Sequence, residues 1–232
     1  MYSILSQGRQ GFRDHQVWGK MRYPLRRLTA MLKLYDLNLS PNAFKVRAVL
    51  HELELPFETI PVDIMQGGGQ TPEYLAKNPN GKVPVLEDGE FVLWESNAII
   101  KYLARLKPEA GLLPEDARPL ARLDQWLFWQ SGHYYTPIIN LAVEKMFKPM
   151  AGKEPDAVLV ASLTQDFLRL TQVLNQGLTG REFLLGRISV ADFALASTLV
   201  PRQQLGLDIS AFPAVAAWIE RMEARESWKK AK

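Results

Sequence analysis

The chain contains no cysteine among its 232 residues. This absence excludes disulfide bonds, thiolate metal ligands and a nucleophilic thiol supplied by the protein itself. The chain also lacks any run of about 18 uninterrupted apolar residues, so we expect no membrane span. Its three histidines show no spacing typical of a metal site, and we expect no metal. With 47% hydrophobic and 23% charged residues, the composition predicts a folded protein of one large or two small domains.

Positive charge is concentrated at the N-terminus. Residues 1–30 hold six Lys or Arg and one Asp, a net charge of +5. Since the whole chain carries +3, residues 31–232 carry a net charge of −2, which argues against nucleic acid as a partner of the whole chain. We expect residues 1–30 to be a flexible basic extension. A transit peptide, a nucleic-acid-binding arm and a natural start at Met31 are the alternatives.

The first elements after this extension predict a parallel strand pair. Residues 32–35 alternate between apolar and polar and predict a strand, and residues 57–62 predict a second one. Between them, apolar residues with helical spacing predict a helix that ends before Pro56; these residues are Val46, Val49, Leu50 and Leu53. A strand, helix and strand in this order form a parallel pair joined by a right-handed crossover.

The next segment predicts a short helix, a hairpin and a longer helix. Thr71 followed by Pro72 is typical of a helix start. Residues 83–86 and 91–94 read as two strands joined by a turn at 87–90. Ser96 is a candidate N-cap for a helix with an apolar face. The predicted order for residues 31–107 is therefore βαβ-α-ββα.

The second half of the chain predicts helices alone. Residues 107–118 are rich in Pro and Gly and suggest a linker between domains. Apolar residues with helical spacing recur at 163–174 and 215–222, and the nearly all-apolar segment 191–200 predicts a buried central helix. We therefore expect an α/β domain followed by an all-helical domain, residues 118–232.

Three positions in this pattern carry candidate chemistry. Ser40 and Asn42 precede a helix, where a hydroxyl donor and the helix dipole favour a bound thiolate over a thiol. A cis Val83–Pro84 bond would leave the Val83 backbone facing out, able to pair with an extended peptide. Glu95 is suited to pair with the ammonium group of a ligand. The helix N-terminus that follows it is suited to bind the carboxylate of the same ligand. Plain helix caps and an edge proline are the structural alternatives.

Three motifs carry a family resemblance. They are Asn78-Pro79-Asn80-Gly81-Lys82-Val83-Pro84-Val85-Leu86, Trp94-Glu95-Ser96-Asn97-Ala98-Ile99, and the capping-box segment Ser189-Val190-Ala191-Asp192. Together they resemble the cytosolic glutathione transferases. The resemblance implies a thioredoxin-like domain at residues 31–107, an all-helical domain at 118–232, and glutathione as the cosubstrate.

The resemblance also implies roles for individual residues. Val83 would pair with the cysteinyl backbone of glutathione, and Glu95 with Ser96 would hold its γ-glutamyl end. Lys82 would lie near the glycyl end, and Gln70 stands where some classes have a further glycyl contact. Asn97 stands where several classes have Arg. Ser189 and Asp192 would act in folding alone.

For activation of the thiol, three alternatives stay open. The segment from Ser40 to Asn42 is similar to the Thr-Pro-Asn segment of the bacterial nu class, where both side chains approach the glutathione sulfur. Tyr35 is a second candidate. An alignment to the plant phi pattern would instead place Ala43, which has no donor, at the activating position. Ser131 and Tyr135 are candidates for the cleft that holds the second substrate.

The resemblance implies a cytoplasmic homodimeric enzyme that directs the glutathione thiolate at a soft electrophile or a peroxide. A glutathione-dependent disulfide reductase or peroxidase needs no protein cysteine and is a close alternative. A non-catalytic interaction module built on the same fold is the alternative from another class.

Overall fold

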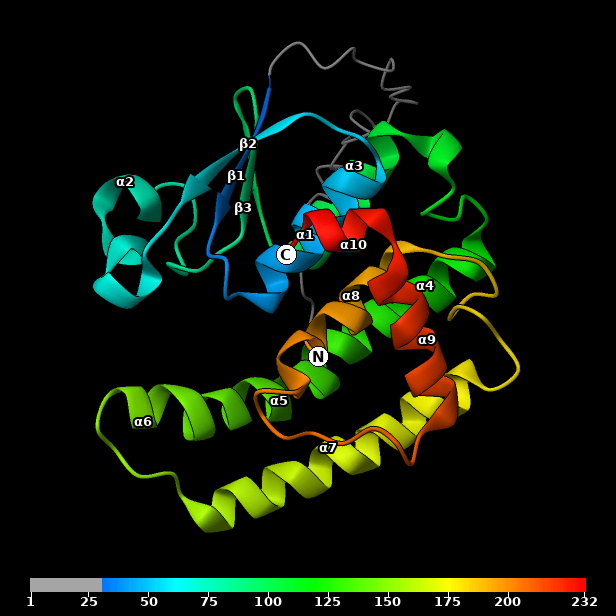
Figure 1. The fold of residues 1–232 in the computed structure, drawn as a ribbon. Coiled ribbons are helices and arrows are strands. Elements are labelled where there is room, and N and C mark those ends of the chain that lie inside the picture. Colours follow the sequence, from blue (N-terminus) through cyan, green and yellow to red (C-terminus); the bar gives the residue numbers. More distant parts are fainter. Residues whose placement is uncertain (1–30) are drawn as a thin grey trace, which may run out of the picture.

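A computed structural model describes residues 31–232, so the predicted basic extension, residues 1–30, lies outside the described residues. The N-terminal part is a four-stranded sheet in the order β2-β1-β3-β4 (Figure 1). Its strands are β1 (Leu32–Asp36), β2 (Phe57–Pro61), β3 (Val85–Asp88) and β4 (Phe91–Trp94). Strand β1 runs parallel to β2 and antiparallel to β3, and β4 is antiparallel to β3. The predicted parallel pair is confirmed. The predicted hairpin is present too, but Glu87 and Asp88 belong to β3, so the turn is shorter than the expected 87–90.

Three helices accompany this sheet: α1 (Pro41–Glu52), α2 (Pro72–Leu75) and α3 (Ser96–Leu106). Pro41 occupies the first turn of α1, and the Ser40 side chain caps it by accepting a hydrogen bond from the Ala43 backbone N–H. Thr71 caps α2 in the same way, as the sequence predicts. The order βαβ-α-ββα is that of a thioredoxin-like fold.

The remaining elements are helical, and residues 95–232 contain no strand. These helices are α4 (Ala117–Trp129), α5 (Tyr135–Ala142), α6 (Lys148–Met150), α7 (Ala157–Leu178), α8 (Val190–Thr198), α9 (Pro213–Ala224) and α10 (Glu226–Lys230). A π-helical turn at 130–134 continues α4 into α5, so that they form one long helical rod in Figure 1. Within the described part of the chain, no helix is both long and apolar enough to cross a membrane.

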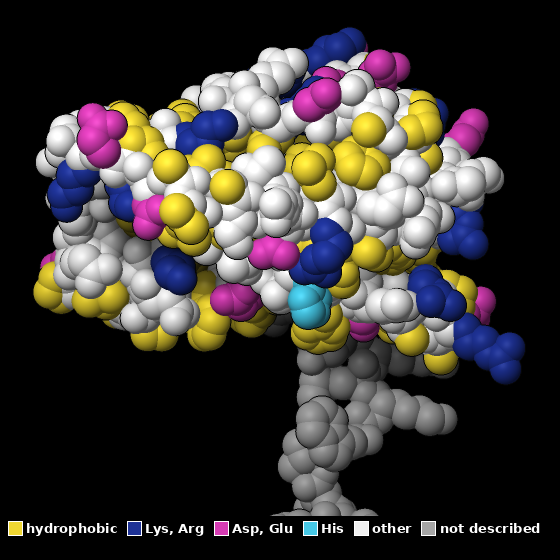
Figure 2. Space-filling model, turned by 90° about the horizontal axis from the view of Figure 1, so that it is seen from below, with side chains coloured by type: hydrophobic (Ala, Val, Ile, Leu, Met, Phe, Trp, Pro, Cys, Tyr) yellow, Lys and Arg dark blue, Asp and Glu magenta, His cyan; other side chains and the backbone are white. Residues whose placement is uncertain are grey.

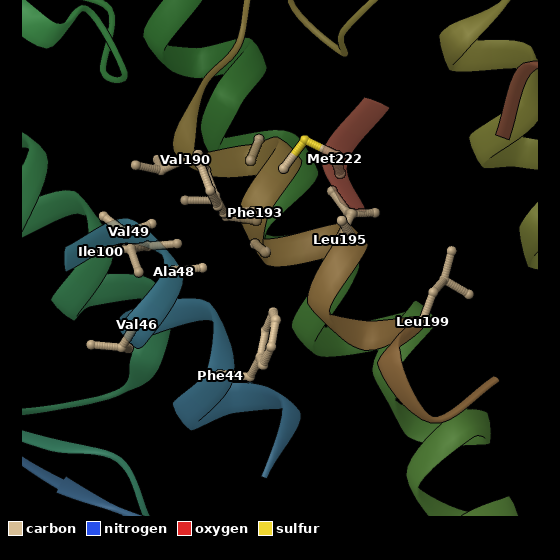
Figure 3. Packing of buried hydrophobic residues seen from close by; sticks show 14 of the residues in the cluster. Phe44, Val46, Ala48, Val49, Ile100, Val190, Phe193, Leu195, Leu199 and Met222 are labelled. Atoms are coloured by element: carbon tan, nitrogen blue, oxygen red, sulfur yellow. The ribbon is translucent and has the colours of Figure 1, made fainter. Parts of the chain in front are cut away.

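Helix α8 is the centre of the C-terminal domain, and every one of its residues is buried. Figure 3 shows Phe193 and Val190 of α8 facing Val49 of α1 and Ile100 of α3, so that one core spans both domains. Asp192 closes the predicted capping box by accepting hydrogen bonds from the backbone N–H and the hydroxyl of Ser189, both at 2.9 Å. The predicted buried helix and its cap are confirmed.

Exposed apolar side chains on the lower face lie dispersed. Figure 2 views the molecule from the side of α6 and α7 in Figure 1 and shows hydrophobic side chains interspersed with charged ones. Among the described residues, Met150 of α6 and Val158 of α7 are two of the most exposed apolar side chains, at 72% and 80%. Isolated exposed apolar residues of this kind are normal on a protein surface.

The last residues of the chain pack against α1. The Arg47 guanidinium on α1 donates to the backbone carbonyl of Ala231 at 2.9 Å and to both carboxylate oxygens of Asp36 at 2.6 Å. The rings of Phe44 and Trp228 meet edge to face, with centroids 4.6 Å apart. Helix α1 is therefore held between the sheet and the C-terminal helices (Figure 1).

Candidate active site

A polar cavity of about 260 Å³ lies between the two domains. Seven of the nine predicted site residues line it: Asn42, Lys82, Val83, Glu95, Ser96, Ser131 and Tyr135. The first five come from the N-terminal domain and the last two from the rod formed by α4 and α5. Residues from four separate segments of the sequence thus converge on one cavity.

Val83 presents its backbone at one edge of this cavity. The Val83–Pro84 peptide bond is cis, as predicted, but strand β3 begins at Val85, two residues later than expected. Among the described residues, the backbone N–H and C=O of Val83 have no hydrogen-bond partner. The preceding carbonyl, of Lys82, is held by the Tyr74 hydroxyl at 2.9 Å and the Asn78 side-chain amide at 2.6 Å. This loop therefore offers a fixed, unpaired peptide edge to an extended ligand.

Glu95 has an unusual backbone at the start of α3. Its φ of 71° and ψ of 104° are uncommon for a residue with a side chain, and such strain tends to occur at functional sites. Ser96 was expected to be the N-cap, but this prediction is wrong. Glu95 occupies the cap position and Ser96 is the first helical residue. The exposed carboxylate and the positive end of the α3 dipole therefore lie side by side.

An apolar cavity of about 140 Å³ adjoins the polar one, and Tyr135 lines both. The start of α1 divides them, since Asn42 lines the polar cavity and Ser40 the apolar one. The Ser40 oxygen accepts from the Ala43 N–H at 3.3 Å, which leaves its own O–H proton to donate elsewhere. Burial raises the pKa of Tyr135, so its phenol stays protonated at neutral pH and can donate a hydrogen bond.

Comparison with known proteins agrees with this geometry. Residues 30–105 match the family profile "Glutathione S-transferase, N-terminal domain", and residues 134–226 match "Glutathione S-transferase, C-terminal domain". The chain is 36% identical over 210 residues to Glutathione S-transferase 3 of Zea mays, covering 87% of this chain and 93% of that protein. The chain belongs to the glutathione S-transferase family.

Solved structures of the glutathione S-transferase family have the same fold. One, glutathione S-transferase-I bound with lactoylglutathione, is 30% identical with a TM-score of 0.79 and covers 87% of this chain and 98% of its own. Another, the glutathione transferase URE2P8 from Phanerochaete chrysosporium with oxidized glutathione, is 28% identical with a TM-score of 0.80, covering 87% of this chain and 93% of its own. The predicted fold class is confirmed.

Three further candidate positions of this glutathione S-transferase, besides Ser40, lie outside the polar cavity. Gln70 is exposed, and its side-chain amide lies against Gly81, where an added Cβ would come within 2.3 Å of Nε2. The alternative activator Tyr35 packs edge to face on Tyr74, with centroids 6.0 Å apart, and lines neither cavity. Ala43, the position given by the phi alignment, is fully buried. Ser40 and Asn42 are thus the predicted activators that face the two cavities.

A polar network that lines the cavity and continues behind it was missed by sequence reasoning. Lys45 Nζ donates to Asn97 Oδ1 at 2.8 Å, and Asn97 Nδ2 donates to Gln130 Oε1 at 3.0 Å. Gln130 Nε2 then donates to the Thr198 hydroxyl at 3.0 Å. The network joins α1, α3, the start of the 130–134 turn and α8 across the domain interface. Among the described residues, no cluster of His, Asp or Glu is suited to hold a metal ion.

Proposed function

We propose that this glutathione S-transferase holds glutathione in the polar cavity and an electrophile in the apolar cavity, with the reacting sulfur at the start of α1. The observation that carries this assignment is the contribution of α1 to both cavities, through Asn42 on one side and Ser40 on the other. Because Tyr135 lines both, the two cavities adjoin, which suits a reaction between two bound molecules.

The polar cavity has groups of the right chemistry for each part of glutathione. The unpaired Val83 backbone suits the cysteinyl peptide unit, and the Glu95 carboxylate suits the γ-glutamyl ammonium. Ser96, at the positive end of α3, suits the γ-glutamyl carboxylate. The Lys82 ammonium suits the glycyl carboxylate, and Gln70, beside the same loop, would add a contact there. These assignments agree with the roles that the sequence motifs imply.

We assign activation of the sulfur to Ser40 and Asn42, the segment similar to the nu class. Lowering a thiol pKa from about 8.5 to about 6.5 needs roughly 2.7 kcal/mol of preferential thiolate stabilisation. One charge-assisted hydrogen bond and the α1 dipole together supply about that amount. The thiolate then forms the new carbon–sulfur bond, the leaving group departs with its electron pair, and the thiol proton passes to solvent. The Tyr135 phenol would donate to the leaving group.

The apolar cavity indicates the class of second substrate. Its walls include Phe44, Ile138 and Phe147, and none of the residues that line it is charged. An anionic or cationic electrophile would lose its hydration there without a compensating partner. We therefore propose an uncharged, largely apolar electrophile such as an aryl halide.

We further propose a homodimer, acting in the cytoplasm, built from units at residues 31–107 and 118–232. Strand β4 is an edge of the sheet and exposes Phe91 and Trp94, at 47% and 38%. On α4, Phe128 is 76% exposed. Large exposed aromatic side chains of this kind are typical of a protein–protein interface. The matches at residues 30–105 and 134–226 support the two units.

The test is a conjugation assay with the purified protein, glutathione and an activated aryl halide, with thioether formation followed by absorbance. We expect a rate above the uncatalysed reaction that saturates with glutathione. Retention on glutathione-agarose without turnover of halides, peroxides or mixed disulfides would instead indicate an interaction module. Absence of both turnover and retention would overturn the proposal.

A further inference from the structure

Lys45 on α1 is a fully buried lysine that lies directly behind the polar cavity. Its side chain is 0% exposed, which is rare for lysine because the ammonium group loses its hydration. Among the described residues, its Nζ has one hydrogen-bond partner, Asn97 Oδ1 at 2.8 Å. Asn97 lines the cavity and Lys45 does not. One amide group therefore separates this amine from whatever occupies the cavity.

The charges around Lys45 are few. Helix α1 packs on α3, α8 and α10. Glu95, just before α3, is the one charged group that acts on the amine within the described part of the chain. The carboxylate of Asp192 on α8 is engaged by Ser189 and Trp218, and Lys229 of α10 pairs with Glu226. Among residues 31–232, no carboxylate forms a hydrogen bond or ion pair with Lys45.

These surroundings lower the charge of the amine at neutral pH. Burial lowers the pKa of Lys45 to about 7, and Glu95 opposes this effect only in part. A group with a pKa near 7 changes its protonation state readily in response to a nearby charge. Lys45 is thus poised to respond to an anion in the cavity.

We propose that Lys45 is a positioning residue whose amine takes up a proton when an anionic ligand occupies the polar cavity, with Asn97 held between the two. The inference rests on the proposed function, since the ligand is glutathione or an analogue with a net negative charge. Asn97 Oδ1 must accept from Lys45, which directs its Nδ2 toward Leu127 O and Gln130 Oε1. The lysine therefore also fixes the orientation of two side chains that line the cavity.

The direction of the pH effect follows from linkage. A bound anion stabilises the protonated amine, so binding is stronger where Lys45 carries its proton and weakens as the pH rises through about 7. If binding raises the pKa of Lys45 by about one unit, each protein molecule takes up about half a proton on binding near pH 7.5. The Kd for the anion then rises by up to about tenfold between pH 6 and pH 9.

The test is titration calorimetry with S-methylglutathione, which has no thiol to ionise, in buffers with different ionisation enthalpies at pH 7.5. We expect net proton uptake by the unaltered protein. Lys45→Met, which is similar in length but uncharged, should lose about half a proton of this uptake. Any uptake that persists belongs to the ligand amine. Lys45→Arg should bind with little pH dependence, because guanidinium stays charged.

A matched control is Lys101→Met on α3, since Lys101 is partly exposed and pairs with Asp124 at 2.6 Å. It should leave the uptake unchanged. Equal uptake by the unaltered protein and Lys45→Met, or net release by the unaltered protein, would overturn the proposal while leaving the proposed function intact. If S-methylglutathione does not bind at any pH, both proposals fail. The measurement on the unaltered protein shows whether binding takes up or releases protons, even if the variants do not fold.

Discussion

The indole N–H of Trp218 donates a hydrogen bond to Asp192 Oδ1 at 3.0 Å. This contact joins α9 to the start of α8, and the same carboxyl group also accepts from Ser189 and from the Leu184 backbone N–H. Asp192 is fully buried, and burial raises its pKa against the opposing effect of these donors. A single side chain therefore ties three segments of the C-terminal domain together.

Replacing this carboxylate should destabilise the protein. Asp192→Ala removes the acceptor for four recorded hydrogen bonds and leaves buried donors without a partner. We expect a loss of about 3 kcal/mol in the free energy of unfolding, measured by urea denaturation. Asp124→Ala, which breaks an ion pair that is about one-third exposed, should cost less than about 1 kcal/mol. Equal losses would contradict a structural role for Asp192.

Ser40→Ala should reduce turnover by about 10- to 100-fold, since a hydrogen bond to a charged group contributes about 1.5–3 kcal/mol. The same change removes the α1 cap and should lower the unfolding free energy by about 1 kcal/mol. Turnover measured at pH 6.5 reports the loss of activation, and denaturation reports the loss of the cap. Ser40→Thr, which keeps both the hydroxyl and the cap, should restore most of the rate. Unaltered turnover of the alanine variant at pH 6.5 would eliminate Ser40 as the activator.

Glu95→Gln should weaken glutathione binding by about tenfold or more, because it removes the charge proposed to pair with the γ-glutamyl ammonium. The side chain is exposed and makes no cap hydrogen bond, so thermal stability should hardly change. Calorimetric Kd values and melting curves check both. Glu90→Gln, in the exposed turn between β3 and β4, is the control and should leave binding unaltered. A large drop in melting temperature without loss of affinity would mark Glu95 as structural.

Phe128→Asp should shift the protein from dimer to monomer, because it places a charge where the proposed interface buries an aromatic ring. Sedimentation velocity at micromolar concentration measures the result. Met150→Asp changes an equally exposed apolar residue on α6 and should leave the dimer intact. A monomeric unaltered protein would refute the homodimer itself.

Local patterns predicted most of the fold. The strand, helix and strand order, the cis Val83–Pro84 bond and the Ser189–Asp192 cap each depend on residues close together in sequence. The misplaced cap at Ser96 has a different origin. Glu95 adopts a positive φ that its residue type disfavours, so tertiary contacts rather than local preference determine where α3 begins.

Lys45 was missed because a lysine on an amphipathic helix normally faces water. Helix α1 is covered by the sheet domain on one side and by α8 and α10 on the other, so all residues from Ala43 to Leu50 are buried. The division of the site into two cavities likewise depends on how the rod of α4 and α5 lies against α1. Both features arise from packing between segments far apart in sequence, which no local pattern records.

The contact of Arg47 with the Ala231 carbonyl also couples the motions of α1 to those of the last residues of the chain. Since Phe44 packs on Trp228, and Glu52 pairs with Arg225, releasing α10 would uncover the helix that begins at the proposed sulfur site. Helices α1 and α10 should therefore open as one cooperative unit, with matching amide hydrogen-exchange protection. Local unfolding of the last residues would then also disturb the start of α1, where the sulfur is proposed to react.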